Sequence, residues 1–414
     1  MIYDAVIVGG GAAGLAGAAF LGRAARRCGG EKHLLLLEKA PRVGKKLLAT
    51  GNGTCNLTNM HAAPAHYHGD AALATAVLAA FPPEKAVAFF ESVGVDCAVR
   101  ENGRVYPLSE QAAAVLDALR LEAAACGVEI ACDRPAERLS PCHEGWRVDT
   151  PSGAVLARRV LFCPGGAASP SLGGSADGYR LLTDLGCEKT PLFPSIVQVR
   201  TATEFVRAVK GIRVDATVRV LADGNCVGEE TGEVLFTDYG LSGPAVMQVS
   251  RSVADWERRK KGAMTAVLDL LPAWSEERLR ARLEERRQLP GRTLEDLFTG
   301  LLHKRVGQTV LRVAGILPLD RPVSTLTDAE YARAAATVKA WKLEVTGTQG
   351  FGGAQVTAGG IAAGTVDPQT MECRRHPGLY LAGEVLDVDG DCGGFNLQFA
   401  WSSAYVAATA MMTE

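Results

Sequence analysis

Apolar and polar positions alternate in blocks at the start of the chain. Residues 3–8 (YDAVIV) are apolar and rich in β-forming residues, as a buried strand is, and three glycines follow. Residues 12–27 are small and alanine-rich with arginines near the end, a pattern that predicts a helix. Residues 33–37 form a second apolar run, which ends at Glu38. This order predicts a β-α-β unit at the N-terminus.

The pattern then changes several times along the chain. Short apolar runs separated by turn signals between about 128 and 162 predict a three-stranded antiparallel meander. Residues 192–250 have a strand-like pattern, whereas 252–340 are more charged and mostly helical in pattern, with Thr327 and Glu330 spaced as a capping box. A strand-like run at 378–381 precedes an apolar helix expected over about 396–411. We therefore expect a nucleotide-binding domain built from both chain ends, with the central part inserted.

Composition narrows the function classes. Hydrophobic residues make up 47% of the 414 residues and the net charge is −2, so no global field attracts nucleic acid or an anionic membrane. The basic run at 258–261 is more often a solvated helix face, so we expect no nucleic-acid partner, although tRNA-modifying flavoproteins of this fold keep such a substrate as an alternative. We find no uninterrupted apolar run of about 18 residues and no basic segment before the first strand, so we expect neither a membrane span nor a signal peptide.

The cysteines and histidines indicate the compartment and the metal content. The 11 cysteines are odd in number and irregular in spacing, unlike a disulfide framework or a zinc site. Reduced thiols in a cytoplasmic protein are the simpler interpretation. The histidines form no catalytic triad pattern, and those at 61, 66 and 68 lie in a segment expected to be a loop. We therefore predict no metal site.

The first glycine cluster carries the clearest chemistry. Gly9, Gly11 and Gly14 have GxGxxG spacing between a strand and a helix. Gly9 permits the tight turn, Gly11 lets the backbone approach a pyrophosphate, and Gly14 allows close helix–strand packing. Glu38 ends the second strand, where an acid binds a ribose hydroxyl. A glycine turn without a ligand would leave that acid unexplained, so the motif predicts dinucleotide binding.

Two further segments favour FAD over NAD. The first, Gly383-Glu384, follows a strand near the C-terminus, and Gly393-Gly394 opens the last helix, where N–H groups and the helix dipole would face developing negative charge on a flavin. In the second segment, residues 50–59 (TGNGTCNLTN), the glycines permit close backbone approach to a flat ring and the asparagines suit its polar edges. Either segment alone could also be an ordinary glycine-rich turn. Cys55 and Cys392 fall in these segments, and we expect them to be small packing residues.

The motifs at 50–59, 233–244 (EVLFTDYGLSGP) and 378–398 (GLYLAGEVLDVDGDCGGFNLQ) resemble a bacterial flavoprotein family. It is known as the NAD(P)/FAD-dependent or aminoacetone oxidase family of FAD-binding enzymes, and it includes BaiN-type bile-acid reductases. The resemblance covers nearly the whole chain. It implies that noncovalent FAD lies along Lys45, Lys46 and the 50–57 loop. Combined with the motifs, the expected cofactor-binding residues are Gly9, Gly11, Ala12, Ala13, Gly14, Glu38, Lys39, Lys45, Lys46, Gly51, Asn52, Gly53, Asn56, Leu57, Gly165, Gly166, Gly383, Glu384, Gly393, Gly394, Asn396 and Leu397.

The resemblance also implies the architecture. We expect an α/β protein with a Rossmann-like FAD-binding domain of glutathione-reductase type, a β-barrel-like insertion and a helical unit. The expected boundaries are 1–190 with 346–414 for the FAD domain, 191–251 with 315–345 for the β-rich unit, and 252–314 for the helical part. The chain departs from the family pattern at Thr54, usually Arg, and at Asp238, often His. Substrate identity therefore does not transfer from relatives through these two positions.

Three functions remain open from the sequence. The first is a reductase that passes hydride from NAD(P)H through the flavin to an activated C=C bond of a small molecule such as a steroid enone. No second GxGxxG is found, so NAD(P)H would bind transiently. The second is an oxidase of a small amine that releases H₂O₂, and the third is an FAD-binding regulatory protein without turnover. Candidate catalytic residues on the substrate side are Tyr106, Asp238, Tyr239 and Ser242, with Arg104 beside Tyr106.

Overall fold

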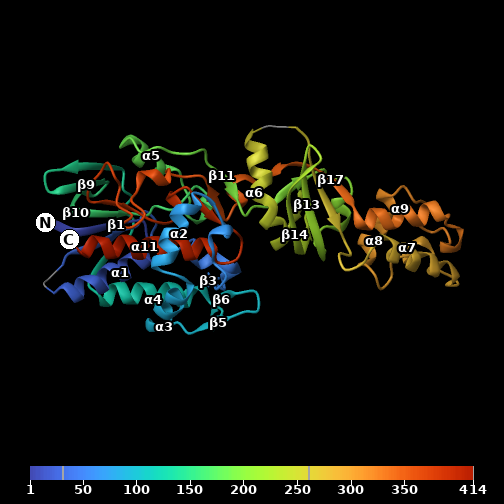
Figure 1. Ribbon diagram of the computed structural model, residues 1–414, viewed down its shortest axis with the longest axis horizontal. Coiled ribbons are helices and arrows are strands. Elements are labelled where there is room, and N and C mark those ends of the chain that lie inside the picture. Colours follow the sequence, from blue (N-terminus) through green and yellow to red (C-terminus); the bar gives the residue numbers. More distant parts are fainter. Residues whose placement is uncertain (30–31, 260–261, 414) are drawn as a thin grey trace. The chain divides into compact units, whose positions relative to one another are not determined.

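The computed structural model describes residues 1–29, 32–259 and 262–413 and divides the chain into two compact units. Unit 1 comprises Met1–Phe193 and Gln355–Glu414, and unit 2 comprises Pro194–Ala354. Figure 1 shows the elements of each unit along the chain. Part of the basic run at 258–261, namely 260 and 261, lies outside the described residues.

A mostly parallel sheet forms the centre of unit 1, with strand order β7-β2-β1-β10-β9-β8 and β19 paired to β10. The strands β1 and β2 are buried along most of their length because both faces of the sheet are covered. Helix α1 connects them, which confirms the predicted β-α-β unit. The bounds are β1 Ile2–Val8, α1 Ala12–Cys28, β2 Leu34–Leu37, β7 Val128–Ala131, β8 Arg138–Cys142, β9 Gly145–Thr150, β10 Gly153–Phe162 and β19 Leu379–Leu381.

The meander differs in one respect from the prediction. Strands β8, β9 and β10 form the antiparallel meander, but β7 pairs in parallel with β2 instead. A short apolar run does not reveal its partner, so the sequence pattern could not separate β7 from the meander.

Helix α1 packs against the last helix, α11 (Phe395–Thr413), and both helices contact strand β10 of the sheet (Figure 1). Small residues allow this close packing: a Cβ added at Gly17 would lie 2.5 Å from Leu161 Cδ2 and 3.9 Å from Ala404 Cβ. Among the described residues, no single helix has the length and apolar character to span a membrane, and only the bent pair α2–α3 passes that test when taken together. The remaining elements of unit 1 are α2 Ala71–Ala80, α3 Pro83–Ser92, α4 Ala112–Ala125, α5 Asp177–Asp184, β3 Thr58–Asn59, β4 Tyr67–Gly69, β5 Cys97–Val99, β6 Arg104–Pro107, β18 Val356–Ala358 and β20 Val388–Gly390.

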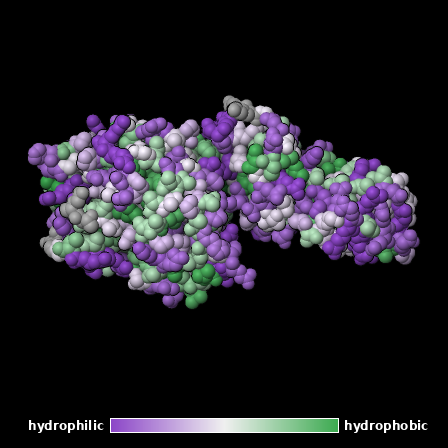
Figure 2. Space-filling view, viewed as in Figure 1, coloured by the Kyte–Doolittle hydropathy of each residue, from purple (hydrophilic) through white to green (hydrophobic). Residues whose placement is uncertain are grey.

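Unit 2 contains a closed six-stranded barrel with helices packed beside it. The barrel includes β16, which lies inside a stretch predicted to be mostly helical; its six residues are largely buried, and such a short run has no distinguishing period. Helix α9 begins with the predicted capping box of Thr327 and Glu330. Figure 2 shows mainly hydrophilic residues on the visible face of α7–α9. The bounds are β12 Val199–Thr201, β13 Arg213–Ala222, β14 Asn225–Phe236, β15 Gly240–Ser242, β16 Met264–Asp269, β17 Trp341–Thr348, α6 Pro244–Arg259, α7 Glu276–Glu285, α8 Lys304–Val313 and α9 Asp328–Lys339; β11 (Phe193–Ser195) and α10 (Gly350–Gly353) stand next to the unit boundaries.

Candidate active site

The carboxyl ends of β1 and β10 meet at a switch point of the sheet. Val8 of β1 pairs with Leu37 of β2 on one side and with Phe162 of β10 on the other. Strand β1 therefore has the next strand of the chain on one side and a strand from much later in the chain on the other. Ligands of open α/β sheets bind in the crevice at such a point. Gly9 turns there with φ +106°, and a Cβ on it would lie 2.3 Å from the carbonyl oxygen of Cys163. A side chain at this position is therefore excluded by backbone atoms.

The three motif glycines have different surroundings. A Cβ at Gly14 would lie 1.8 Å from the carbonyl oxygen of Gly9, so this glycine is required for packing. A Cβ at Gly11 would meet no atom within 4 Å, and the φ of Gly11 is an ordinary −83°. Gly165, after β10, also faces open space. Among the described residues no side chain caps α1, so the N–H groups of its first turn, including those of Ala12 and Ala13, remain available to an anion.

Glu38 organises the edge of this crevice. Its Oε2 accepts a hydrogen bond from the N–H of Gly10 at 2.7 Å, and its Oε1 accepts one from the N–H of Ala40 at 2.7 Å. These two bonds fix the carboxylate beside the glycine turn and leave acceptor capacity for ribose hydroxyls. Lys39, the next residue, is exposed.

A second acid, Glu384, lies beyond β19. Lys46 Nζ donates to both of its carboxylate oxygens, at 3.1 and 2.8 Å, and the N–H of Thr357 donates to Oε1 at 2.8 Å. Gly166 leaves room for this carboxylate, because a Cβ there would lie 2.6 Å from Glu384 Oε1. Gly383 adopts φ +74°, and a Cβ on it would press on Ala13 at 2.9 Å. The GxGxxG segment after β1, which we call the first glycine fingerprint, therefore contacts Gly383-Glu384 after β19, the second glycine fingerprint. Lys45 is half-buried.

The loop at 50–59 is attached to the start of α11. Trp401 Nε1 donates to the carbonyl of Leu57 at 2.8 Å, and Asn59 Nδ2 donates to the carbonyl of Gly393 at 3.1 Å. A Cβ at Gly394 would lie 2.5 Å from the carbonyl oxygen of Thr58, so only glycine permits this approach. The three consecutive positions Gly51, Asn52 and Gly53 all have positive φ.

One atom in this loop lacks a partner. Asn56 Oδ1 is buried and has no hydrogen-bond partner among the described residues. A buried acceptor of this kind is costly unless a ligand supplies a donor. Asn396, by contrast, is engaged: its side chain accepts from the Gly390 N–H at 2.9 Å and donates to the Gly390 carbonyl at 2.7 Å. Leu397 follows it and is half-buried.

Strand β6 presents two side chains toward these segments. A Cβ at Gly51 would lie 3.7 Å from Tyr106 Cε1, and a Cβ at Gly393 would lie 3.2 Å from Arg104 Nε. Arg104 and Tyr106 are two positions apart and therefore share a face of the strand. Among the described residues the Arg104 side chain has neither an ion pair nor a hydrogen bond. An unpaired cation thus lies against the glycines that open α11.

A histidine–aspartate cluster lies next to the same glycines and was not predicted. His66 Nδ1 and His68 Nε2 each lie 3.0 Å from a different oxygen of Asp391, and the His66 ring stacks on Phe395 at 4.5 Å. Burial opposes the charged form of Asp391, but the hydrogen bonds to the two imidazoles lower its pKa overall. Pairing of β4 with β20 brings these distant residues together. The segment expected to be a mobile loop is therefore anchored.

Thiols in the crevice are poor nucleophiles. Cys55 is fully buried, and burial raises its pKa to about 11. Burial also raises the pKa of Cys163, which lies at the end of β10. Both thiols remain protonated near neutral pH, which supports a packing role for Cys55.

The other substrate-side candidates belong to unit 2. Asp238 is exposed and forms an ion pair with Lys210 at 2.6 Å, and this contact lowers its pKa. Tyr239 is half-buried and accepts a backbone hydrogen bond from Thr201, whereas Ser242 is buried in β15. The structure therefore brings Asp238, Tyr239 and Ser242 together in one hairpin of unit 2. Tyr106 lies instead with the glycine segments of unit 1.

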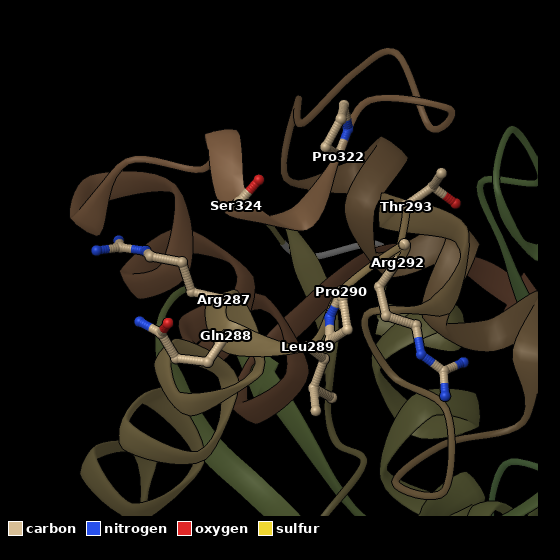
Figure 3. A pocket seen from close by; sticks show the side chains of 9 residues that line it. Arg287, Gln288, Leu289, Pro290, Arg292, Thr293, Pro322 and Ser324 are labelled. Atoms are coloured by element: carbon tan, nitrogen blue, oxygen red, sulfur yellow. The ribbon is translucent and has the colours of Figure 1, made fainter.

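A separate hollow lies in the helical part of unit 2 (Figure 3). It has a volume of about 420 Å³. Arg287, at one side, already pairs with Asp328 at 2.7 Å. Its lining holds no acid, histidine or thiol, so it offers no group for proton transfer: Arg287, Gln288, Leu289, Pro290, Gly291, Arg292, Thr293, Pro322 and Ser324.

Comparisons with known proteins show which sequences this chain resembles. The family described as HI0933-like protein Rossmann domain matches residues 3–410. A 3-dehydro-bile acid delta(4,6)-reductase of Clostridium scindens is 37% identical over 98% of both chains. A ribosomal RNA dihydrouridine synthase of Escherichia coli is 29% identical over 98% of this chain and 97% of its own. The resemblance inferred from the sequence motifs is thereby confirmed.

Solved structures support the fold class. An open-conformation flavocytochrome c3 fumarate reductase matches with a TM-score of 0.51 at 17% identity, over 99% of this chain and 78% of its own. The FrdA subunit of Escherichia coli quinol fumarate reductase matches with a TM-score of 0.52 at 17% identity, over all of this chain and 70% of its own. At this identity the likeness concerns the fold alone.

Proposed function

Because the chain belongs to the HI0933-like protein Rossmann domain family and is an FAD-dependent oxidoreductase, we propose that it is a reductase. Its substrate class is a small organic molecule with a C=C bond conjugated to a carbonyl group, such as a steroid or bile-acid enone. The observation that carries the proposal is the 37% identity with a 3-dehydro-bile acid delta(4,6)-reductase over 98% of both chains.

The crevice of unit 1 fits FAD. The open space at Gly11 and the uncapped start of α1 suit a pyrophosphate, and Glu38 suits a ribose. The orphaned Asn56 Oδ1 would accept from a ring N–H of the flavin. When bound, FAD supplies hydride transfer from its N5 atom. The Lys46–Glu384 pair would hold the linker between the two ends of the cofactor.

Arg104 and Tyr106 are our candidates for the substrate side in unit 1. Addition of hydride to the β carbon of an enone places negative charge on the carbonyl oxygen, and a proton must then reach the α carbon. A guanidinium without an internal partner, as in Arg104, would stabilise that charge. The Tyr106 hydroxyl would donate the proton. Asp238, Tyr239 and Ser242 remain candidates that depend on how unit 2 meets the substrate.

We propose NAD(P)H as a transient donor. No second GxGxxG unit is found in the sequence, so the nicotinamide would bind, leave and be replaced by the substrate in a ping-pong cycle. A packed nucleotide site is not required for this kinetic scheme.

A second candidate substrate is uridine in RNA. Two relatives that extend over nearly the whole chain are described as ribosomal RNA dihydrouridine synthases, at 29% and 28% identity. Uracil contains a C=C bond conjugated to a carbonyl, so the chemistry would be the same. The net charge of −2 argues against a large polyanion and favours the small molecule. Amine oxidation with release of H₂O₂, the alternative reaction expected from the sequence, requires no conjugated C=C bond.

Product analysis separates these candidates. The reduced enzyme would be mixed anaerobically with a steroid dienone, with uridine-containing RNA, or with buffer, and products would be identified by mass spectrometry. Reduction of one C=C bond of the dienone per reduced flavin supports the proposal. Formation of dihydrouridine without reduction of the dienone would contradict the proposal and identify uridine in RNA as the substrate. Peroxide formation with aminoacetone in air, without reduction of either alkene, would establish the oxidase.

A further inference from the structure

Two buried cysteines and a histidine meet in unit 1, away from the crevice. Potential ligand atoms of Cys187, Cys373 and His376 all lie within 4.8 Å of one another. Cys187 is 8% exposed and Cys373 is 2% exposed. Cys187 follows helix α5, whereas the other two residues belong to the turn before β19. The cysteine spacings suggested no metal site above, yet Cys373 and His376 are spaced as a CxxH pair.

The histidine is oriented as a metal ligand is. His376 Nε2 lies 2.8 Å from the carbonyl oxygen of Leu185. A carbonyl only accepts, so Nε2 carries the hydrogen and the lone pair of the neutral ring is on Nδ1. Metal-binding histidines almost always donate their other N–H to a carbonyl or carboxylate in this manner. Leu185 lies two residues before Cys187, so both sides of the cluster help to fix the ring.

The turn that carries Cys373 and His376 is fixed by backbone hydrogen bonds. The Cys373 N–H donates to the carbonyl of Leu379 at 2.7 Å, and the His376 N–H donates to the carbonyl of Cys373 at 3.0 Å. Both residues are therefore held on one short turn, and the thiolate is the form of cysteine that binds metals.

We propose that Cys187, Cys373 and His376 bind Zn²⁺, with water from the half-buried histidine side as the fourth ligand. Two sulfurs and one imidazole nitrogen are ligands that this borderline-soft ion prefers. Binding releases the two thiol protons to solvent and changes no oxidation state. Two thiolates balance the charge of the ion, so the neighbouring Arg375 does not oppose it.

Such a site would join two elements that border the flavin crevice. Helix α5 carries Tyr179, whose hydroxyl donates to the carbonyl of Glu384 at 3.2 Å. The Cys373–His376 turn leads through β19 into Gly383-Glu384. The zinc ion would therefore fix the end of α5 relative to the start of β19, next to the Gly383-Glu384 segment. The role is structural, and it does not depend on the proposed reaction.

Metal analysis of the intact flavoprotein tests the proposal. The protein would be produced in zinc-supplemented medium, purified with a reductant, freed of loose metal on a chelating resin and measured by elemental mass spectrometry. We expect stoichiometric zinc. Replacement by Co²⁺ should give d–d absorption at wavelengths where oxidised flavin is transparent. Absence of both signals in the wild-type protein would overturn the proposal without reference to any variant.

Variants locate the metal. Cys373→Ser and His376→Gln should lose zinc, whereas Cys226→Ser, an exposed cysteine of unit 2, should keep it. FAD content and circular dichroism identify a variant that fails to fold. Retention of zinc by folded Cys373→Ser would overturn the assignment. A Cys187–Cys373 disulfide in peptides of the wild-type protein, with two fewer free thiols than the 11 in the sequence, would also overturn it.

Discussion

Lys46 Nζ lies 2.8 Å from Glu384 Oε2, across 338 positions of the chain. The pair is partly buried, with side-chain exposures of 30% and 22%. It links the segment after β2 to the fingerprint after β19, which the sequence alone could only place in order along the chain. It also holds a carboxylate and an ammonium at the crevice where we expect FAD.

Disruption of this pair should weaken FAD binding. In Lys46→Met the Glu384 carboxylate loses both hydrogen bonds from its counter-ion and is no longer held at the crevice. Loss of one charge-assisted hydrogen bond to FAD in consequence costs roughly 1.5–3 kcal/mol, or about tenfold or more in affinity. FAD retention after dialysis, followed by fluorescence, measures the effect. Lys85→Met, on an exposed lysine of the same unit, is the matched control. Equal retention in both variants would remove Lys46 from the cofactor site.

Substitutions of the motif glycines should separate ligand contact from packing. Gly11→Val should yield a folded but colourless protein, because its side chain enters open space that the pyrophosphate needs. Gly364→Val, at another open position of unit 1, should stay yellow. Gly14→Ala should instead impair folding, since its Cβ would lie 1.8 Å from the carbonyl oxygen of Gly9. A fully yellow Gly11→Val protein would refute the assignment of this motif to FAD.

Loss of Arg104 or Tyr106 should slow the reduction of the substrate more than the reduction of the flavin. A positioned acid or electrostatic donor contributes roughly 10²–10³-fold to a rate. Stopped-flow measurement of Arg104→Met and Tyr106→Phe, with the two half-reactions recorded separately, gives the comparison. If both half-reactions were unchanged, neither side chain would take part in catalysis. Lys85→Met, at an exposed lysine of unit 1 outside the crevice, provides a control of similar charge change.

Asp391 should make folding stability depend on pH in the acid range. Its pKa is lower in the folded protein than in the unfolded chain, so its contribution is present above the ordinary aspartate range and is lost as pH falls through the folded pKa. Between about pH 5 and pH 3 the wild type should therefore lose more stability than Asp391→Asn. Urea unfolding at several pH values measures this. Parallel losses in the two proteins would show that the carboxylate contributes nothing.

The parts that followed from local pattern were predicted well. The β-α-β unit is set by apolar period and glycine spacing, and the capping box at Thr327 by residues three positions apart. Features that depend on distant pairing were not predictable. The partners of Asp391 are more than 300 positions away. The four residues of β7 contain no pattern that reveals its parallel pairing with β2.

The candidate site shows the same division. The glycines at 9, 14 and 394 were identified in the sequence from their motif spacing and their place before a helix. In the structure, backbone atoms leave no room for a side chain at these three positions. The arrangement of Arg104 against Gly393 required the structure, since strand β6 shares no sequence motif with α11. Likewise, the CxxH spacing is visible in the sequence, but its third partner, Cys187, comes from a separate helix end.

Anaerobic titration of the purified yellow protein with NADH and then with NADPH tests the central claim most directly. A reductase should lose its flavin absorption near ~450 nm rapidly with one of the two nicotinamides and regain it on addition of a conjugated enone. Slow recovery in air would distinguish it from an oxidase. Flavin that neither nicotinamide reduces, but that an amine bleaches and air restores with peroxide, would contradict the account.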